Sequence, residues 1–129
     1  MKTTDFMVGD WLRTSRGIAK VIAVDKIGLT FEIDGGDYDI DRDDEDAWFD
    51  GVVLTKEVLE KIGFKKLQTA MDRKYYEISF DNGQYARYDE DFYCRVVGPN
   101  GNFEHKYIRF VHDLQHLFRI AGINKKITL

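Results

Sequence analysis

Short segments of alternating apolar and polar residues, separated by glycine-containing turns, are the feature of this sequence that most constrains its fold. A period of two is typical of a strand that buries one face, and tight turns join such strands into antiparallel sheets. Residues 29–34 (LTFEID) and 37–41 (DYDID) follow this pattern on either side of a Gly–Gly turn. Four short segments of this kind, at residues 6–14, 18–24, 29–34 and 37–41, predict a small curled sheet or barrel.

Two other segments have helical spacing instead. In residues 54–64, Thr55 is suited to the N-cap, Gly63 to the C-terminal cap, and Leu54 and Leu59 to a hydrophobic staple. Residues 111–121 carry an apolar stripe along one side and are followed by Gly122. The sequence therefore predicts one short helix near the middle of the chain and a second one near its end.

Between these helices the strand pattern returns, at residues 74–80, 84–88, 92–97 and 103–110, with an Asn–Gly and a Pro–Asn–Gly turn between strands. We therefore expect an α+β protein that forms one globular unit. Residues 1–53 are expected to form an antiparallel barrel-like lobe that resembles a small SH3-like barrel, and residues 54–129 a short helix and an antiparallel β-meander packed by a C-terminal helix. The core is expected to include Trp11, Val21, Ile22, Val24, Phe31, Leu59, Ile62, Ile78, Phe80, Val96, Val111, Leu114 and Phe118.

Composition excludes several classes of protein. The chain has 129 residues, of which 43% are hydrophobic and 14% aromatic, so it is not a disordered chain. No apolar run is long enough to span a membrane, and the start (MKTTD) does not read as a secretory signal. The single cysteine, Cys94, excludes an internal disulfide and a multi-cysteine zinc site. We expect a cytoplasmic protein without a cofactor, and Cys94 to be a buried, unreactive thiol.

Charge is distributed unevenly along the chain. Residues 34–50 hold nine acidic residues and one arginine, a net charge of -8, whereas the whole chain has a net charge of -4. Strand geometry places Asp37, Asp39, Asp41 and Asp43, here called the acidic quartet, on one face. The spacing resembles part of an EF-hand loop but lacks its glycine and its final glutamate. Three interpretations stay open: a weak divalent-cation site, a solvated acidic loop, and a surface that binds a basic protein or mimics nucleic acid.

A second group of residues combines bases with aromatic rings. Exposed aromatic side chains between basic ones can stack on single-stranded nucleic acid, so these residues form a candidate nucleic-acid-binding set. Strand alternation, however, buries half of any such set, and neighbouring acids reduce its positive field. The bases of this candidate set are Lys65, Lys66, Arg73, Lys74 and Arg87, with Tyr75, Tyr85, Tyr88 and Arg95 beside them.

The third candidate is a pair of histidines one helical turn apart, His112 and His116, in the segment HDLQH. This spacing can bind zinc, and Asp113 stands where zinc proteases have glutamate. A third ligand has to come from upstream, for example Glu104 or His105. The helical wheel places both histidines away from the apolar stripe. We therefore expect a polar face or a partner contact, with a zinc site as the alternative.

Three segments together resemble a known family: residues 8–12 (VGDWL), 54–66 (LTKEVLEKIGFKK) and 107–118 (YIRFVHDLQHLF), the last followed by a short glycine-containing tail. In this order they resemble small uncharacterised proteins carried by prophages and mobile elements of anaerobic gut bacteria. The likeness lies in caps, core residues and turns rather than in a catalytic signature. The family has no assigned activity, so the resemblance implies no functional residues.

No decisive catalytic motif is present in the sequence. We therefore predict a non-enzymatic protein-interaction module of a mobile element, with an unidentified protein partner. The alternative is a nucleic-acid-binding accessory protein, and the third hypothesis is a metal-dependent enzyme that uses His112 and His116.

Overall fold

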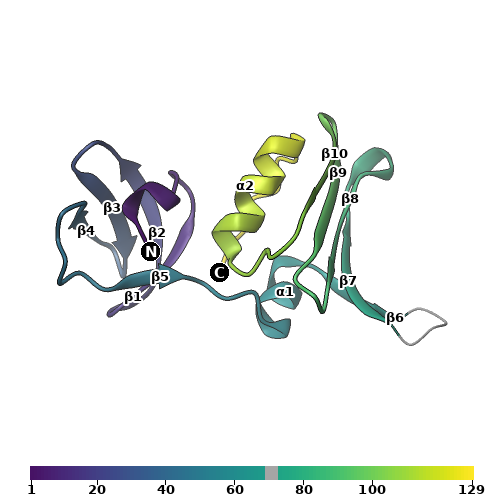
Figure 1. Ribbon diagram of the computed structural model, residues 1–129, viewed down its shortest axis with the longest axis horizontal. Helices are drawn as coiled ribbons and strands as arrows, with labels where there is room; N and C mark the ends of the chain where they lie inside the picture. The colour runs from purple at the N-terminus through teal and green to yellow at the C-terminus, as the bar shows by residue number, and fades with distance from the viewer. Residues whose placement is uncertain (69–72) are drawn as a thin grey trace. The chain divides into compact units, whose positions relative to one another are not determined.

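The computed structural model describes residues 1–68 and 73–129, which divide into two compact units, Met1–Val52 and Val53–Leu129. Each unit contains one five-stranded antiparallel sheet, and both helices belong to the second unit (Figure 1). The expected α+β class with antiparallel sheets is therefore confirmed. Within the described residues, neither helix has the length and apolarity needed to cross a membrane.

The first unit is a four-stranded meander to which a fifth strand returns. Strand β1 pairs with β2 on one side and with β5 on the other, so the strand order is β4-β3-β2-β1-β5. The first strand starts later than predicted, at Trp11, because Gly9 adopts a positive φ and the Asp10 carboxylate accepts a hydrogen bond from the backbone N–H of Met7. The elements are η1 (Thr3–Asp5), β1 (Trp11–Thr14), β2 (Gly17–Val24), β3 (Gly28–Ile33), β4 (Gly36–Asp41) and β5 (Phe49–Gly51).

Alternating residues of these strands form the core of the first unit, as their period of two requires. The sheet curls around these side chains, and the Phe31 ring stacks on Tyr38 with 5.6 Å between ring centroids. The buried cluster consists of Phe6, Leu12, Ala19, Val21, Leu29, Phe31 and Ile40.

Two residues expected in this core are on the surface instead. Ile22 and Val24 are 37% and 38% exposed. The register between β2 and β3 shifts between Val21 and Ala23, so Ile22 is the extra residue of a β-bulge. Alternation from the buried Val21 already directs Ile22 away from the core, and Val24, although opposite Leu29, is the last residue of β2 and is left partly uncovered there. Trp11, also expected in the core, is only partly buried.

The second unit contains both helices and a meander of strands in the order β10-β9-β8-β7-β6. Strands β5 in the first unit and β6 in this one were not predicted, because segments of three or four residues carry little periodic signal. The elements are α1 (Lys56–Ile62), β6 (Lys65–Gln68), β7 (Lys74–Ser79), η2 (Asp81–Gly83), β8 (Tyr85–Asp89), β9 (Cys94–Gly98), β10 (Gly101–His105) and α2 (Val111–Ala121).

The caps expected for helix α1 are confirmed. The Thr55 hydroxyl accepts a hydrogen bond from the backbone N–H of Val58, and Gly63 ends the helix with a φ of 121°. Leu54 and Leu59, the predicted staple, are both buried. Because these signals lie within one short segment, the sequence alone locates this helix.

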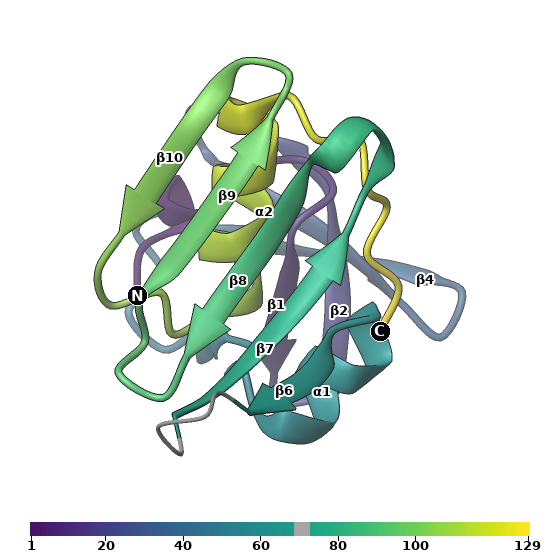
Figure 2. The ribbon, with the colours of Figure 1, turned by 90° about the vertical axis from the view of Figure 1, so that its right-hand side faces the viewer.

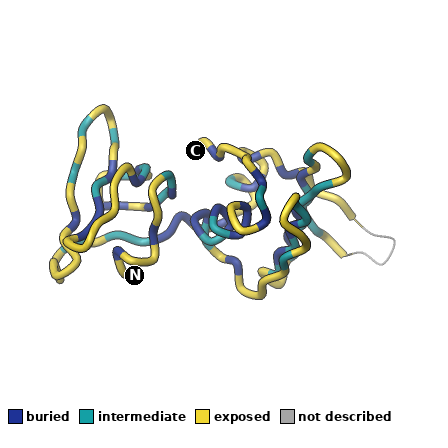
Figure 3. Tube along the Cα trace, turned by 90° about the horizontal axis from the view of Figure 1, so that it is seen from above, coloured by how far each residue is buried: buried dark blue, intermediate teal, exposed yellow. Residues whose placement is uncertain are grey.

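Both helices lie on the same face of the second sheet, and α2 packs on β9 and β10 (Figure 2). Buried side chains of the strands, including Ile78, Ala86 and Val96, face these helices. The Phe118 ring of α2 meets the Phe80 ring edge to face at 5.7 Å, although Phe80 itself is only partly buried. In both units the hairpin tips are exposed and the buried residues lie along the strands and helices (Figure 3).

The last strand is shorter than the predicted segment 103–110. It ends at His105, and Tyr107 then adopts a left-handed φ of 65°, which extended strands do not contain. The backbone N–H of Ile108 bonds to the Phe92 carbonyl at 2.8 Å instead of continuing the ladder. The tail after Gly122, considered as an edge strand from its sequence, forms no strand in the described residues.

Candidate binding surface

The face of the second sheet that points away from the two helices carries tyrosine and arginine side chains. Strand pairing places Glu77 of β7 opposite Arg87 of β8, Arg87 opposite Arg95 of β9, and Arg95 opposite Glu104 of β10. None of the described elements of the second unit crosses this face (Figure 2). We define the tyrosine–arginine face by its central residues, Tyr75, Tyr85, Arg87, Tyr93 and Arg95.

The side chain of Arg87 is held by aromatic rings. Its guanidinium carbon lies 4.8 Å from the centroid of the Tyr75 ring and 5.3 Å from that of Tyr85. Such cation–π contacts fix the plane of the guanidinium on the sheet. The one carboxylate that Arg87 contacts in the described residues is Glu77, at 3.4 Å. Arg87 is therefore well positioned and only weakly neutralised.

Arg95, directly opposite, is held by polar contacts instead. It forms a salt bridge with Glu104 at 2.5 Å, and hydrogen bonds to Tyr85, Glu104 and Tyr93 raise the pKa of its guanidinium. Hydrogen bonds from Tyr93 and Arg95 lower the pKa of the Glu104 carboxyl, and the hydrogen bond to Glu104 raises the pKa of Tyr93. These side chains therefore form one connected network on the surface of β8–β10.

Two hollows lie along this face. The larger, about 340 Å³, lies at the start of β7 and the end of β8, and the smaller, about 200 Å³, lies between the two arginines. Arg87 and Asp89 line both. The other lining residues are Arg73, Lys74, Tyr75, Glu90 and Asp91 in the larger hollow, and Tyr93 and Arg95 in the smaller.

The predicted basic set is brought together only in part. Lys65, opposite Glu77, and Arg87 lie on the tyrosine–arginine face, whereas the alternation along β6 assigns Lys66 to the other face. Arg73 and Lys74 line the larger hollow at its edge. Tyr88, considered with this set, is buried, and its hydroxyl donates a hydrogen bond to the carbonyl of Ile108 at 2.6 Å.

Three residues of this surface were missed from the sequence: Glu77, Tyr93 and Glu104. Glu77 and Glu104 are ordinary strand residues, Tyr93 directly precedes β9, and none of the three lies in a recognisable motif. The signal that could have found them is the register of the hairpins, because the turns at residues 81–83 and 98–101 fix which residues lie opposite one another.

The acidic quartet lies in the first unit. Asp37, Asp39 and Asp41 share one face of β4 as predicted, and all four members are exposed. Asp43 lies beyond the end of β4, so it does not continue this row as expected. The Thr30 hydroxyl donates a hydrogen bond to Asp39 at 2.6 Å, so one of these carboxylates has a partner within the sheet.

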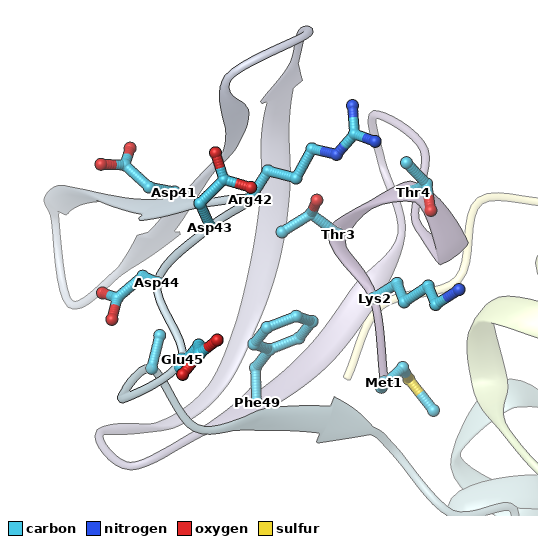
Figure 4. A pocket seen from close by; sticks show the side chains of 11 residues that line it. Met1, Lys2, Thr3, Thr4, Asp41, Arg42, Asp43, Asp44, Glu45 and Phe49 are labelled. Carbon is cyan, nitrogen blue, oxygen red and sulfur yellow. The ribbon is translucent and has the colours of Figure 1, made fainter.

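A cavity of about 480 Å³ lies beside the quartet, between the segment 41–49 and the first four residues of the chain (Figure 4). The carboxylates of Asp41, Asp43 and Asp44 point in different directions rather than toward one centre (Figure 4). Among residues 1–68 and 73–129, no three histidine, cysteine, aspartate or glutamate side chains converge to hold a metal ion. The cation site therefore stays a prediction without geometric support.

The expected orientation of the histidine pair is wrong for one member. His112 is buried, with 3% of its surface exposed, and His116 is partly buried. The helical wheel considers only the residues of the helix itself, whereas the Phe110 ring, which precedes α2, stacks on His112 at 5.6 Å. The two imidazole rings lie 5.8 Å apart, edge to face, and the described residues supply no third ligand beside them.

The single cysteine is buried, in the core of the second unit. Burial raises the pKa of the Cys94 thiol to about 12, so the reactive thiolate is not formed at neutral pH. Burial likewise raises the pKa of Tyr88, its cross-strand neighbour.

Comparison of the chain with protein-family models, with curated proteins and with solved structures gives no match. The resemblance to the mobile-element family accordingly stays a prediction, and the proposed function rests on the residues of the tyrosine–arginine face.

Proposed function

We propose that this chain is a non-enzymatic protein-binding module that uses the tyrosine–arginine face. The observation that carries the proposal is the composition of this face, where three tyrosines and two arginines lie on or immediately beside three adjacent strands. Tyrosine and arginine are enriched at protein interfaces and among the residues that contribute most binding energy. Their side chains here are fixed by one another before any partner arrives, which lowers the entropy lost on binding.

The charge balance of the face favours a protein partner over nucleic acid. Lys65, Arg87 and Arg95 share one row of the sheet with Glu77 and Glu104, and Asp89 lies on the same face opposite Tyr75, so three bases are matched by three acids. Binding to a phosphate backbone depends on an excess of positive charge that displaces counterions. A neutral face with aromatic rings lacks that excess, whereas it suits a protein surface of mixed polarity.

For the first unit we propose an SH3-like topology. Its support is the strand order β4-β3-β2-β1-β5, in which the last strand returns to pair with the first. SH3-like modules bind many kinds of ligand, so this topology by analogy is compatible with a binding role and specifies no partner.

Capture of partners from the native cell by the tagged full chain tests the proposal. We expect a captured protein to be lost with Tyr85→Ala and with Tyr93→Ala, and to be retained with Tyr107→Ala. Tyr107 is a matched control because it is 73% exposed and lies outside the face. Circular dichroism of each variant establishes that the fold persists. Retention of the partner by both face variants would refute the proposal.

Fluorescence anisotropy with short single-stranded DNA and RNA at two salt concentrations tests the rival function. The balanced charge predicts no saturable binding at micromolar concentrations of the chain. Micromolar binding that weakens steeply with salt would identify the chain as a nucleic-acid-binding protein instead.

A further inference from the structure

The two arginines of the tyrosine–arginine face lie directly opposite each other on adjacent strands. Arg87 and Arg95 are register partners on β8 and β9. Their acidic partners, Glu77 and Glu104, lie on the outer strands, one on each side of the pair. Like charges at directly opposite positions of a sheet repel each other, and this repulsion is offset by Glu77 and Glu104 and would be reduced further by a bound anion.

The two guanidinium groups differ in the number of their hydrogen-bonding partners. Arg95 has hydrogen-bonding partners in Tyr85, Tyr93 and Glu104. Arg87 has one, Glu77 at 3.4 Å, which is long for a charge-assisted hydrogen bond. The Nε atoms of both arginines are buried and have no hydrogen-bonding partner in the described residues. A guanidinium has five N–H donors, and in Arg87 one terminal nitrogen contacts Glu77, so the N–H groups of the other terminal nitrogen remain for an anion.

The smaller hollow, of about 200 Å³, lies between these two arginines, with Tyr93 and Asp89 completing its lining. The Oδ1 atom of Asp89 already accepts hydrogen bonds from the backbone N–H groups of Asp91 and Tyr93, so this oxygen is engaged in the turn. Two arginines and one aspartate give the lining of the hollow a net charge of +1, and the carboxylates of Glu77 and Glu104 lie outside this lining, on the neighbouring strands.

We propose that Arg87 and Arg95 form a carboxylate-binding subsite that receives a glutamate or aspartate side chain of the protein partner. This inference rests on the proposed function and specifies the chemistry of the partner. A planar carboxylate matches the fork of a guanidinium and can accept two parallel hydrogen bonds. A phosphate with two negative charges fits less well, because Glu77, Asp89 and Glu104 surround the subsite and would repel the second charge.

The test is a titration of the full chain followed by nuclear magnetic resonance of the arginine Nε–H groups. These groups suit the measurement because the Nε atoms of both arginines are covered, which slows exchange of their protons with water. The probe is a short blocked peptide of alternating glycine and glutamate. We expect saturable shifts of the Arg87 and Arg95 signals with this peptide and none with the same peptide carrying glutamine. Shifts that are equal for both peptides would overturn the proposal.

Variants separate the subsite from the general charge of the face. We expect Arg87→Gln to weaken binding of the glutamate peptide by at least about tenfold, as loss of a charge-assisted hydrogen bond predicts. Arg87→Lys, which keeps the charge and loses the fork, should also weaken binding. Lys65→Gln removes one positive charge from the same row of the sheet and should change affinity less than about twofold. Equal weakening by Arg87→Gln and Lys65→Gln would refute a specific subsite.

Two further measurements distinguish a carboxylate from phosphate as the bound anion, and a failure of the subsite from a failure of the protein-binding function. Inorganic phosphate that binds more tightly than the peptide would assign the subsite to phosphate and overturn the carboxylate proposal. A captured partner that is lost with Tyr85→Ala but retained with Arg87→Gln would overturn the subsite and leave the protein-binding function standing. A partner retained by both tyrosine variants would instead contradict the protein-binding function itself.

Discussion

Alkaline pH should destabilise this protein through its one cysteine. Burial raises the pKa of the Cys94 thiol from 9.0 to about 12, so the folded chain keeps the thiol proton over a range of pH in which the unfolded chain releases it. The stabilisation is fully present below the unfolded pKa and is lost as pH rises toward the folded one. Linkage gives a loss of about 1.4 kcal/mol in the free energy of unfolding between about pH 7.5 and about pH 10.

Urea denaturation of the natural chain and of Cys94→Ala, both under reducing conditions, measures this loss. Other groups also titrate in this range, but they do so in both proteins, so the difference between the two pH profiles isolates the thiol. We expect the natural chain to lose about 1.4 kcal/mol more than the variant over that interval. Parallel profiles would show that the thiol is more accessible than its burial indicates, and would refute the reasoning.

Three other perturbations have expected outcomes. Tyr88→Phe leaves the buried Ile108 carbonyl without its hydrogen bond and should lower the free energy of unfolding by about 1–3 kcal/mol in urea, whereas an unchanged value would show that water replaces the hydroxyl. Thr55→Ala removes the cap on Val58 and should cost about 1 kcal/mol in a thermal melt followed by circular dichroism, with Thr55→Ser as the control that keeps the cap. Replacing all four members of the acidic quartet by asparagine should keep the fold and raise the melting temperature slightly at low salt, with the gain vanishing at high salt. Calcium that stabilises the natural chain by several degrees and not this variant would instead demonstrate a cation site.

What the sequence could predict depended on how local the signals were. Helix α1 was located because its caps at Thr55 and Gly63 lie within one short segment. Ile22 and Val24 were expected in the core because residues 21–24 are all apolar, although alternation from the buried Val21 directs Ile22 outward and Val24 lies at the end of β2. The bulge at Ile22 could not be predicted, because it is defined only against the partner strand β3.

The candidate site followed the same rule. Its bases and several of its tyrosines stood out by residue type, and Arg87 was among them. Their arrangement could not be predicted, because Arg87 and Arg95 lie opposite each other only through the pairing of β8 with β9. Glu104 comes to Arg95 from a further strand, through the β9–β10 hairpin. His112 was misplaced for a related reason, since the ring that stacks on it belongs to Phe110, which lies outside the helix.

The aspartates on β4 bear on how this protein behaves at high concentration. Strand β4 is at one edge of its sheet, where an uncovered row of backbone N–H and C=O groups can recruit a strand from another molecule. Asp37, Asp39 and Asp41 place a negative charge at every second residue of that edge, so two such edges repel each other before they can pair. Replacing these aspartates by asparagine should therefore raise the melting temperature slightly and also increase aggregation. In static light scattering, aggregates of the asparagine variant should appear at a lower protein concentration than aggregates of the natural chain.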